Sequence, residues 1–136
     1  MRTTIALKLV ILLIGIAIMF LGLNIGLGGI RTLGWQIPQN FLNVTDALTF
    51  QTQDNHIRFI GGVWFGIGMI FALSTLALAK LRPTLISLCA IIAVAGLFRF
   101  SILDTDVIFS AAILPSLVFE LLGFPLLAIW LYRSKL

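Results

Sequence analysis

Four long runs of apolar residues follow one another along the chain, separated by shorter polar segments. The runs cover about residues 7–27, 59–79, 84–103 and 107–132. A helix of about 20 mainly apolar residues crosses the hydrocarbon core of a bilayer. The pattern therefore predicts an all-α polytopic membrane protein, in which residues 1–136 form one domain, a bundle of four transmembrane helices.

The composition is that of a membrane protein. Hydrophobic residues make up 60% of the 136 positions and charged residues 10%, whereas soluble domains carry about 25% charged residues. The formal net charge is +4, but the basic residues stand at the ends of apolar runs and form no stripe with interleaved aromatic residues. We therefore expect membrane lipids as partners and no nucleic acid.

The first apolar run has a basic flank, Arg2 and Lys8. A basic start followed by a short apolar core is also typical of a signal peptide. No small-x-small cleavage site follows the run. We therefore interpret it as an uncleaved first span, with a cleaved signal peptide as the alternative.

The longest hydrophilic segment, Ile30–Asn55, joins the first two spans. Gly28 and Gly29 are expected to end the first helix, and Pro38 prevents a regular helix through the middle of the segment. Asn43–Gln53 can form a short amphipathic helix, and the segment also holds aromatic residues suited to the membrane interface, Trp35 and Phe41. We expect a longer outer loop on the membrane surface, with a substrate lid as the alternative.

Basic residues are unevenly divided between the segments that join the spans. Lys80–Pro83 is expected to form a tight turn between the second and third spans. With four spans, this turn and both termini lie on the same side of the membrane. The segments on this side hold Arg2, Lys8, Lys80, Arg82, Arg133 and Lys135. The opposite segments hold Arg31, Arg58 and Arg99, balanced by Asp46, Asp54, Asp104 and Asp106. Because basic residues collect in cytoplasmic segments, both termini are predicted to be cytoplasmic.

Glycines recur at positions that let membrane helices approach closely. Gly15, Gly22 and Gly26 fall on one helical face, and the last two have the small-xxx-small spacing. We predict helix packing at six glycines, namely Gly22, Gly26, Gly61, Gly62, Gly66 and Gly123. For the glycine face of the second span, close approach of a ligand is the alternative.

Few side chains are suited to catalysis or metal binding. The chain has one histidine, His56, outside the apolar runs, and one cysteine, Cys89, within one. One histidine outside the apolar runs is a poor basis for a histidine metal site or a Ser-His-Asp triad. One cysteine cannot form an internal disulfide. We predict no metal site, no cofactor and no enzymatic activity, and we expect Cys89 to be a small buried apolar residue.

One carboxylate, Glu120, lies near the middle of the fourth run. Pro115 and Pro125 are expected to bend that span on either side of it, and Asp104 or Thr105 can cap its start. A charge at this depth rarely faces lipid. Ser116 and Gly123 share the helical face of Glu120, so this face is expected to point into the bundle.

Arg99 is the best partner for Glu120. Counting ~1.5 Å per residue, Glu120 lies ~14 Å below Ala111 and Arg99 lies ~6 Å below Leu103, so ~8 Å separates their depths. Helical side chains lean toward the helix N-terminus, which brings these two together. Arg58 leans outward, toward lipid headgroups, Asp104 or Asp106. An internal ion pair, a site for a ligand, lipid head or proton, and an unpaired protonated carboxyl remain as alternatives.

Three short motifs resemble a family of bacterial four-span membrane proteins, DUF4345. They are Asn55-x-x-Arg58-x-x-Gly61-Gly62, then Gly96-Leu97-Phe98-Arg99, then Glu120 followed by Pro125. The resemblance covers most of the chain and implies that Arg58, Arg99 and Glu120 form a polar core. It implies no activity. A looser similarity to DoxX-type four-helix membrane proteins implies an accessory membrane role.

Two functions are consistent with these features. The first is a non-enzymatic accessory or interaction subunit, which packs through its glycine faces against itself or a larger membrane complex. The second is a binder or transporter of a small molecule, lipid or proton. Its site would lie around Arg58, Arg99, Glu120, Ser116 and Asn55. A polar cavity open to the outer leaflet would favour the binder or transporter. A filled interior would favour the accessory subunit that packs through its glycine faces.

Overall fold

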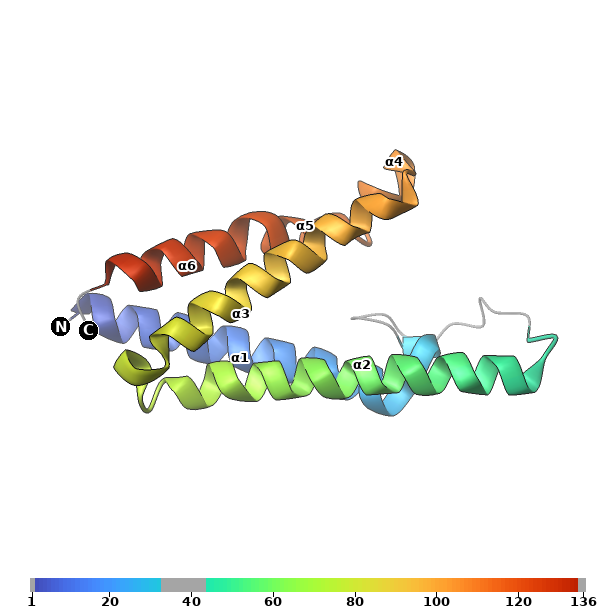
Figure 1. Ribbon diagram of the computed structural model, residues 1–136, viewed down its shortest axis with the longest axis horizontal. Coiled ribbons are helices and arrows are strands. Elements are labelled where there is room, and N and C mark those ends of the chain that lie inside the picture. Colours follow the sequence, from blue (N-terminus) through green and yellow to red (C-terminus); the bar gives the residue numbers. More distant parts are fainter. Residues whose placement is uncertain (1, 33–43, 135–136) are drawn as a thin grey trace. The chain divides into compact units, whose positions relative to one another are not determined.

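A computed structural model describes residues 2–32 and 44–134, and every element within them is helical. The first half of the chain forms α1 (Arg2–Gly28), the 3-10 turn η1 (Gly29–Thr32) and α2 (Ala47–Ser74). The second half forms α3 (Leu78–Phe98), the 3-10 turn η2 (Arg99–Ile102), α4 (Thr105–Ile108), α5 (Leu114–Val118), the π-helical turn η3 (Phe119–Gly123) and α6 (Phe124–Arg133) (Figure 1).

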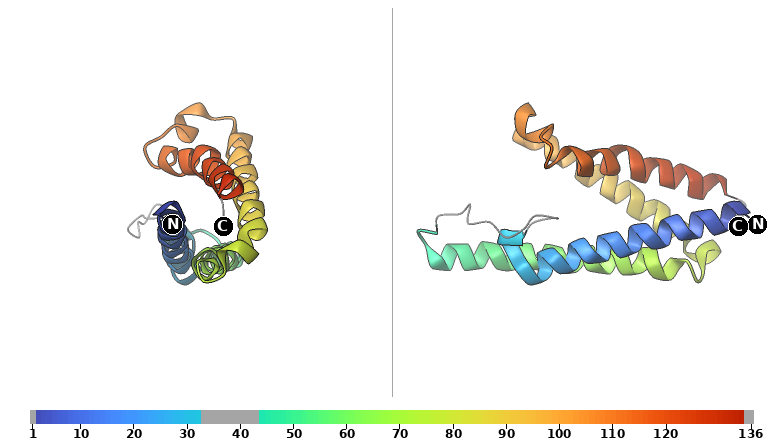
Figure 2. Two further views of the ribbon diagram at one scale, coloured as in Figure 1. Left: turned by 90° about the vertical axis from the view of Figure 1, so that its left-hand side faces the viewer. Right: turned by 180° about the vertical axis from the view of Figure 1, so that it is seen from behind.

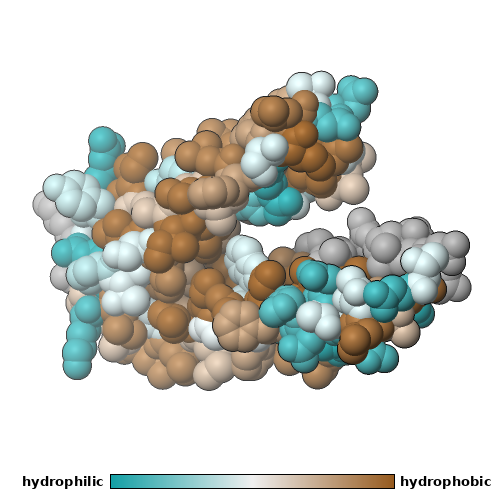
Figure 3. All heavy atoms as spheres, turned by 45° about the vertical axis from the view of Figure 1, so that its right-hand side comes forward, coloured by the Kyte–Doolittle hydropathy of each residue, from teal (hydrophilic) through white to brown (hydrophobic). Residues whose placement is uncertain are grey.

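The described residues contain four helical segments that are long and apolar enough to cross a membrane. They are Thr4–Thr32, Ala47–Ser74, Leu78–Ile102 and Leu114–Arg133. On the face shown in Figure 3, apolar residues cover much of the helices and hydrophilic ones gather toward their ends. The prediction of an all-α protein with four helices of membrane length is confirmed.

The chain divides into two compact units, and each is described by itself. The N-terminal unit is Lys8–Leu76, which contains most of α1 and all of α2. The C-terminal unit is Ala77–Leu136 together with Met1–Leu7.

In the N-terminal unit, α1 and α2 lie side by side and run in opposite directions (Figure 2). A Cβ atom added to Gly15 would lie 2.6 Å from the backbone nitrogen of Ala72, and one added to Gly68 would lie 2.6 Å from that of Met19. Only glycine fits where two backbones approach so closely.

The predicted packing glycines divide into two groups. Gly22, Gly26 and Gly61 lie in the α1–α2 contact, where a Cβ on Gly22 or Gly61 would collide with the opposite backbone. In contrast, a Cβ on Gly62 or Gly66 would meet nothing within 4 Å. These two therefore have no close neighbour among the described residues, and their packing against a helix of another chain stays a prediction. Each residue turns a helix by about 100°, so Gly62 cannot share the α1-facing side with Gly61.

The predicted short amphipathic helix at Asn43–Gln53 is instead the beginning of α2. Asp46 caps it by accepting hydrogen bonds from the backbone N–H groups of Leu48 (3.0 Å) and Thr49 (3.2 Å). The helix then continues without a break to Ser74 because no glycine or proline interrupts it before the apolar run. Pro38, together with Trp35, Phe41 and Asn43, lies outside the described residues, as does the middle of the predicted surface loop, residues 33–43.

The turn between the second and third spans lies earlier than predicted. The helix α2 ends at Ser74, and α3 begins at Leu78, so Lys80–Pro83 is helical instead of forming the turn. Pro83 stands in the second turn of α3, where it removes only one helical hydrogen bond. The hydroxyl of Thr75 donates to the carbonyl of Ala72 (2.7 Å), and this contact helps to end α2.

The fourth apolar run is not one continuous helix from residue 107. Asp104 caps the short helix α4, and its carboxylate accepts from the N–H groups of Asp106 and Val107. A turn follows, and the membrane-length segment begins only at Leu114. Pro115 therefore stands at the start of this segment, where proline is favoured, and does not bend it.

In the C-terminal unit, α3 packs against α6. Leu85, Cys89 and Ile92 of α3 and Leu127 and Leu131 of α6 are buried. The burial of Cys89 agrees with its expected role as a small apolar residue. Near the start of α3, the Arg82 guanidinium donates to the carbonyl of Ser134 at the end of α6 (3.0 Å), a partner for one of the free carbonyls at a helix C-terminus.

Candidate functional site

Arg99 and Glu120 form a two-point ion pair in the C-terminal unit. The Nε of Arg99 donates to Oε2 of Glu120, and Nη2 donates to Oε1, each at 2.6 Å. Glu120 is 7% exposed as a residue, whereas the Arg99 side chain is 37% exposed. The predicted pair of Arg99 with Glu120 is therefore present, and both carboxylate oxygens of Glu120 accept hydrogen bonds in it.

A glycine of α3 makes room for this pair. A Cβ atom at Gly96 would lie 2.8 Å from the Cβ of Glu120 and 3.2 Å from its Oε2. Gly96 precedes Arg99, the first residue of η2, by three residues, so both lie on the same side of this helical segment. Gly96 is not among the predicted site residues, although it begins the Gly96–Arg99 motif, and its spacing from Arg99 was the available signal.

Glu120 is the second residue of the π turn η3, a feature that the sequence analysis missed. The N–H of Phe124 donates to the carbonyl of Phe119, five residues earlier, instead of to the carbonyl four residues earlier. Single π turns inside α-helices occur often at functional sites. Pro125, two residues after this turn, is the sequence signal for it.

The two predicted neighbours of Glu120 have different surroundings. Ser116 is half-buried one turn earlier, on α5. A Cβ on Gly123 would meet only the side chain of Phe119, with its Cδ1 at 3.1 Å. Gly123 and Phe119 belong to the same π turn, so this contact lies within one segment, and the packing of Gly123 against another helix stays a prediction.

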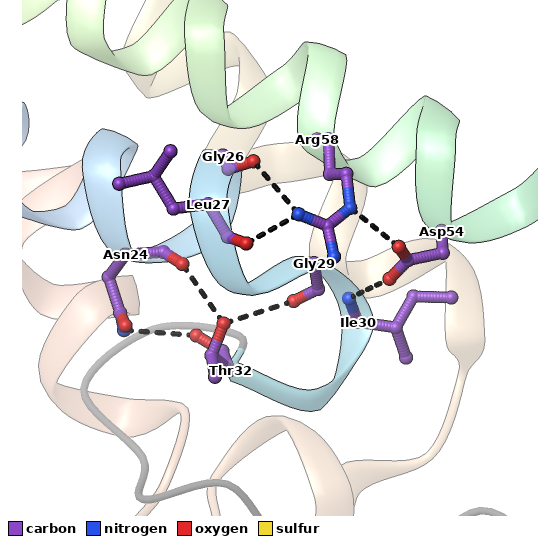
Figure 4. A network of polar contacts seen from close by, with 8 residues as sticks. All are labelled: Asn24, Gly26, Leu27, Gly29, Ile30, Thr32, Asp54 and Arg58. Atoms are coloured by element: carbon purple, nitrogen blue, oxygen red, sulfur yellow. Dashed lines mark hydrogen bonds and ion pairs between the residues drawn. The ribbon is translucent and has the colours of Figure 1, made fainter. Parts of the chain in front are cut away.

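Arg58 belongs to a second polar cluster, in the N-terminal unit (Figure 4). Its Nε donates to Oδ2 of Asp54 at 2.6 Å, one turn earlier on α2. Its Nη1 donates to the carbonyl oxygens of Leu27 and of Gly26, the latter at 3.4 Å. The last carbonyls of a helix have no partner within it and carry a partial negative charge, so Arg58 caps the C-terminus of α1.

Asp54 fixes the turn that follows α1. Its Oδ1 accepts a hydrogen bond from the backbone N–H of Ile30 at 2.8 Å. Gly29 has a φ of +68°, a left-handed conformation that favours glycine after a helix. A Cβ on Gly29 would also collide with the Asp54 carboxylate. The predicted break at the glycines is therefore present, and Asp54 and Arg58 hold it from the neighbouring helix.

A reciprocal pair of hydrogen bonds closes the same turn. The hydroxyl of Thr32 donates to the backbone carbonyl of Asn24 at 2.9 Å, and the side-chain amide of Asn24 donates to the carbonyl of Thr32 at 3.0 Å. Figure 4 shows these contacts beside the Arg58 cluster. The end of α1 is thus held by its own residues and by α2.

The predicted partners of Arg58 are therefore corrected. Arg58 binds Asp54 and the end of α1, whereas lipid headgroups, Asp104 or Asp106 were expected. The spacing of four residues between Asp54 and Arg58 on one helix was the missed signal. Asn55, also predicted for the site, is exposed beside Asp54. Arg58 and the Arg99–Glu120 pair belong to different units, and each cluster is described by itself.

Comparison with known proteins gives one result. A family model described as a domain of unknown function, DUF4345, matches residues 6–131. Neither the curated proteins nor the solved structures contain a match. Within the described ranges, 2–32 and 44–134, no three His, Cys, Asp or Glu side chains lie together in a way that could hold a metal ion.

Proposed function

The chain belongs to the DUF4345 family, and from this premise we propose that it is a non-enzymatic accessory or interaction subunit of a bacterial inner membrane. In this proposal the four apolar helices cross the membrane and both termini are cytoplasmic. The segment between α1 and α2 lies outside. The partner is a second copy of the chain or a larger membrane complex.

The observation that carries this proposal is the open glycine pair on α2. Gly62 and Gly66 have the small-xxx-small spacing, and a Cβ on either would meet nothing within 4 Å. Phe59, Met69 and Leu73 continue the same stripe at spacings of three and four residues, and all three are exposed. Membrane helices associate through small residues that let backbones approach, so this stripe suits a partner helix.

The polar clusters support a structural role. The Arg99–Glu120 pair uses both carboxylate oxygens, and Arg58 is engaged by Asp54 and the end of α1. Charges inside a membrane are costly unless they are paired. In this proposal each cluster fastens two segments of the same chain, and the apolar surface is left for lipid and the partner.

Association measured in lipid bilayers tests the proposal. Single-molecule photobleaching in native-membrane vesicles counts copies of the labelled chain, and native mass spectrometry identifies any second polypeptide at fixed stoichiometry. We expect the complex to be lost with Gly66→Leu and retained with the matched change Ala95→Leu, at an exposed small residue of α3. A monomer without a stoichiometric partner, or equal association of both variants, would contradict the proposal.

The predicted topology has its own test. Reporter fusions at Gln51 and after Leu136 should lie on opposite sides of the membrane, with the fusion after Leu136 in the cytoplasm. The uneven distribution of basic residues is the reason for this expectation. Both fusions on the same side would overturn the topology.

The binder or transporter remains a second candidate because of the Arg99 side chain. It is 37% exposed, and a guanidinium has five N–H donors, of which Glu120 takes two. A small molecule, a lipid headgroup or a proton at this pair would then be the ligand. Lipids retained after gentle extraction from the wild type, but lost from Arg99→Gln with its fold intact, would favour this candidate.

A further inference from the structure

The two prolines of the Leu114–Arg133 segment stand in different settings. Pro115 lies in the first turn, where its missing N–H would have no partner in any case. Pro125 has complete helical turns on both sides. In a regular α-helix its ring would clash with the carbonyl of Leu121, four residues earlier.

The π turn stands where this conflict would arise. It spans Phe119–Gly123, and its bond from the N–H of Phe124 to the carbonyl of Phe119 closes just before Pro125. Local π adjustments let membrane helices tolerate an internal proline. Glu120 thus lies inside the turn that is widened ahead of Pro125.

A widened turn changes the direction in which Glu120 points. One extra residue in a turn offsets the helix before it from the helix after it by about 100°. Leu127 and Leu131 of α6 are 4% and 0% exposed, and α6 packs against α3. With α6 fixed by this packing, a regular α-turn would rotate Glu120 away from Arg99 and from the space at Gly96.

We propose that Pro125 is a positioning residue: it imposes the π turn and thereby directs Glu120 at Arg99. The inference rests on the geometry of η3 and of the ion pair, and it does not depend on the proposed accessory function. Without Pro125, the turn becomes α-helical and the position one residue later, Leu121, takes the place of Glu120. Leu121 already borders Gly96, since its Cδ2 lies 3.1 Å from where a Cβ there would be.

The coupling between Arg99 and Glu120 tests this proposal. Double-mutant cycles with Arg99→Ala and Glu120→Ala, measured by unfolding of the purified full chain in detergent, are run in three backgrounds: wild type, Pro125→Ala and Pro115→Ala. The cycle gives the coupling as a ratio of unfolding equilibrium constants. We expect this ratio to fall by about tenfold or more with Pro125→Ala and to persist with Pro115→Ala. Loss of stability with Pro125→Ala but unchanged coupling would overturn the proposal.

A relocated carboxylate gives a second, independent readout. In the Pro125→Ala background, Glu120→Leu combined with Leu121→Glu should restore the coupling to Arg99. In the wild-type background the same relocation should give weaker coupling than the native Arg99–Glu120 pair, because the π turn persists. If Pro125→Ala does not fold, this second arm still decides, since coupling from position 121 as strong as that of the native pair, with Pro125 present, would show that the π turn does not direct the carboxylate.

Discussion

The carboxylate of Asp54 accepts a hydrogen bond from the backbone N–H of Ile30 at 2.8 Å, and through it α2 holds the turn that ends α1. The same carboxylate binds Arg58, which donates to the last carbonyls of α1. One side chain thus links a backbone donor and a capping cation. The start of the segment between α1 and α2 is fixed by two residues of one helical turn.

Removal of Asp54 should therefore loosen the α1–α2 hairpin. Asp54→Ala leaves the Ile30 N–H without its acceptor and Arg58 without its counter-charge, so we expect a loss of about 1–3 kcal/mol in the free energy of unfolding. Unfolding in detergent measures this loss, and the exposed Gln51→Ala on the same helix is the control. Equal stability of the two variants would contradict the role of Asp54.

Adjacent glycines on α2 should respond in opposite ways to the same change. Gly61→Ala places a methyl group against the backbone of Gly26, whereas Gly62→Ala places one where nothing lies within 4 Å. We expect Gly61→Ala to destabilise the protein by about 1–3 kcal/mol through overpacking. Gly62→Ala should be neutral, or stabilising by up to about 1 kcal/mol because alanine favours the helix.

Thermal unfolding of the two single variants in detergent provides the comparison. Gly68→Ala, which would place its methyl group 2.6 Å from the Met19 backbone, should behave like Gly61→Ala. If Gly61→Ala and Gly62→Ala had the same stability, the close contact of α1 with α2 would be wrong.

The sequence predicted the four membrane-length helices because length and hydropathy alone decide whether a segment can cross a bilayer. It also predicted the Arg99–Glu120 pair, since an intramembrane carboxylate requires a partner at a similar depth. Both predictions follow from the large cost of placing a charge in hydrocarbon.

The remaining features depend on local geometry that hydropathy does not contain. The pattern predicts a turn at Pro83, but near a helix start this proline removes only one hydrogen bond. The spacing predicts the same role for Gly61 and Gly62, although one residue turns a helix by about 100°. The pattern predicts a bend at Pro125, and the structure adds a π turn before it that the pattern does not indicate. Each of these outcomes depends on the exact position of one residue within a helical turn.

The cap of α2 should depend on pH. Hydrogen bonds from the hydroxyl and then the backbone N–H of Thr49, with a further one from Leu48, hold the pKa of the exposed Asp46 below its usual value of 3.8. A carboxylate with a lowered pKa stabilises the folded state above its usual pKa, and this contribution is lost as the pH falls through the lowered value.

Hydrogen exchange at the N–H groups of Leu48 and Thr49 measures the strength of the cap. We expect their protection to be constant near neutral pH and to fall below pH 3.8. Asp46→Asn keeps a capping oxygen but cannot titrate, so its protection should not change with pH in this range. The same acid response in Asp46→Asn would assign the change to another group.

The last prediction concerns the energetic independence of the two polar clusters. Removing one partner of the Arg99–Glu120 pair leaves an uncompensated charge, at a cost of about 3–5 kcal/mol. The double variant Arg99→Ala with Glu120→Ala should lose less than the sum of the single variants, because no charge is stranded. Arg58→Ala should add to Glu120→Ala without coupling, since Arg58 is held by Asp54 and the carbonyls of α1. Unfolding of the single and double variants in detergent measures the coupling energy of the Arg99–Glu120 pair and that of Arg58 with Glu120. Additive losses for Arg99 and Glu120, together with strong coupling between Arg58 and Glu120, would show that Glu120 pairs with Arg58 and not with Arg99.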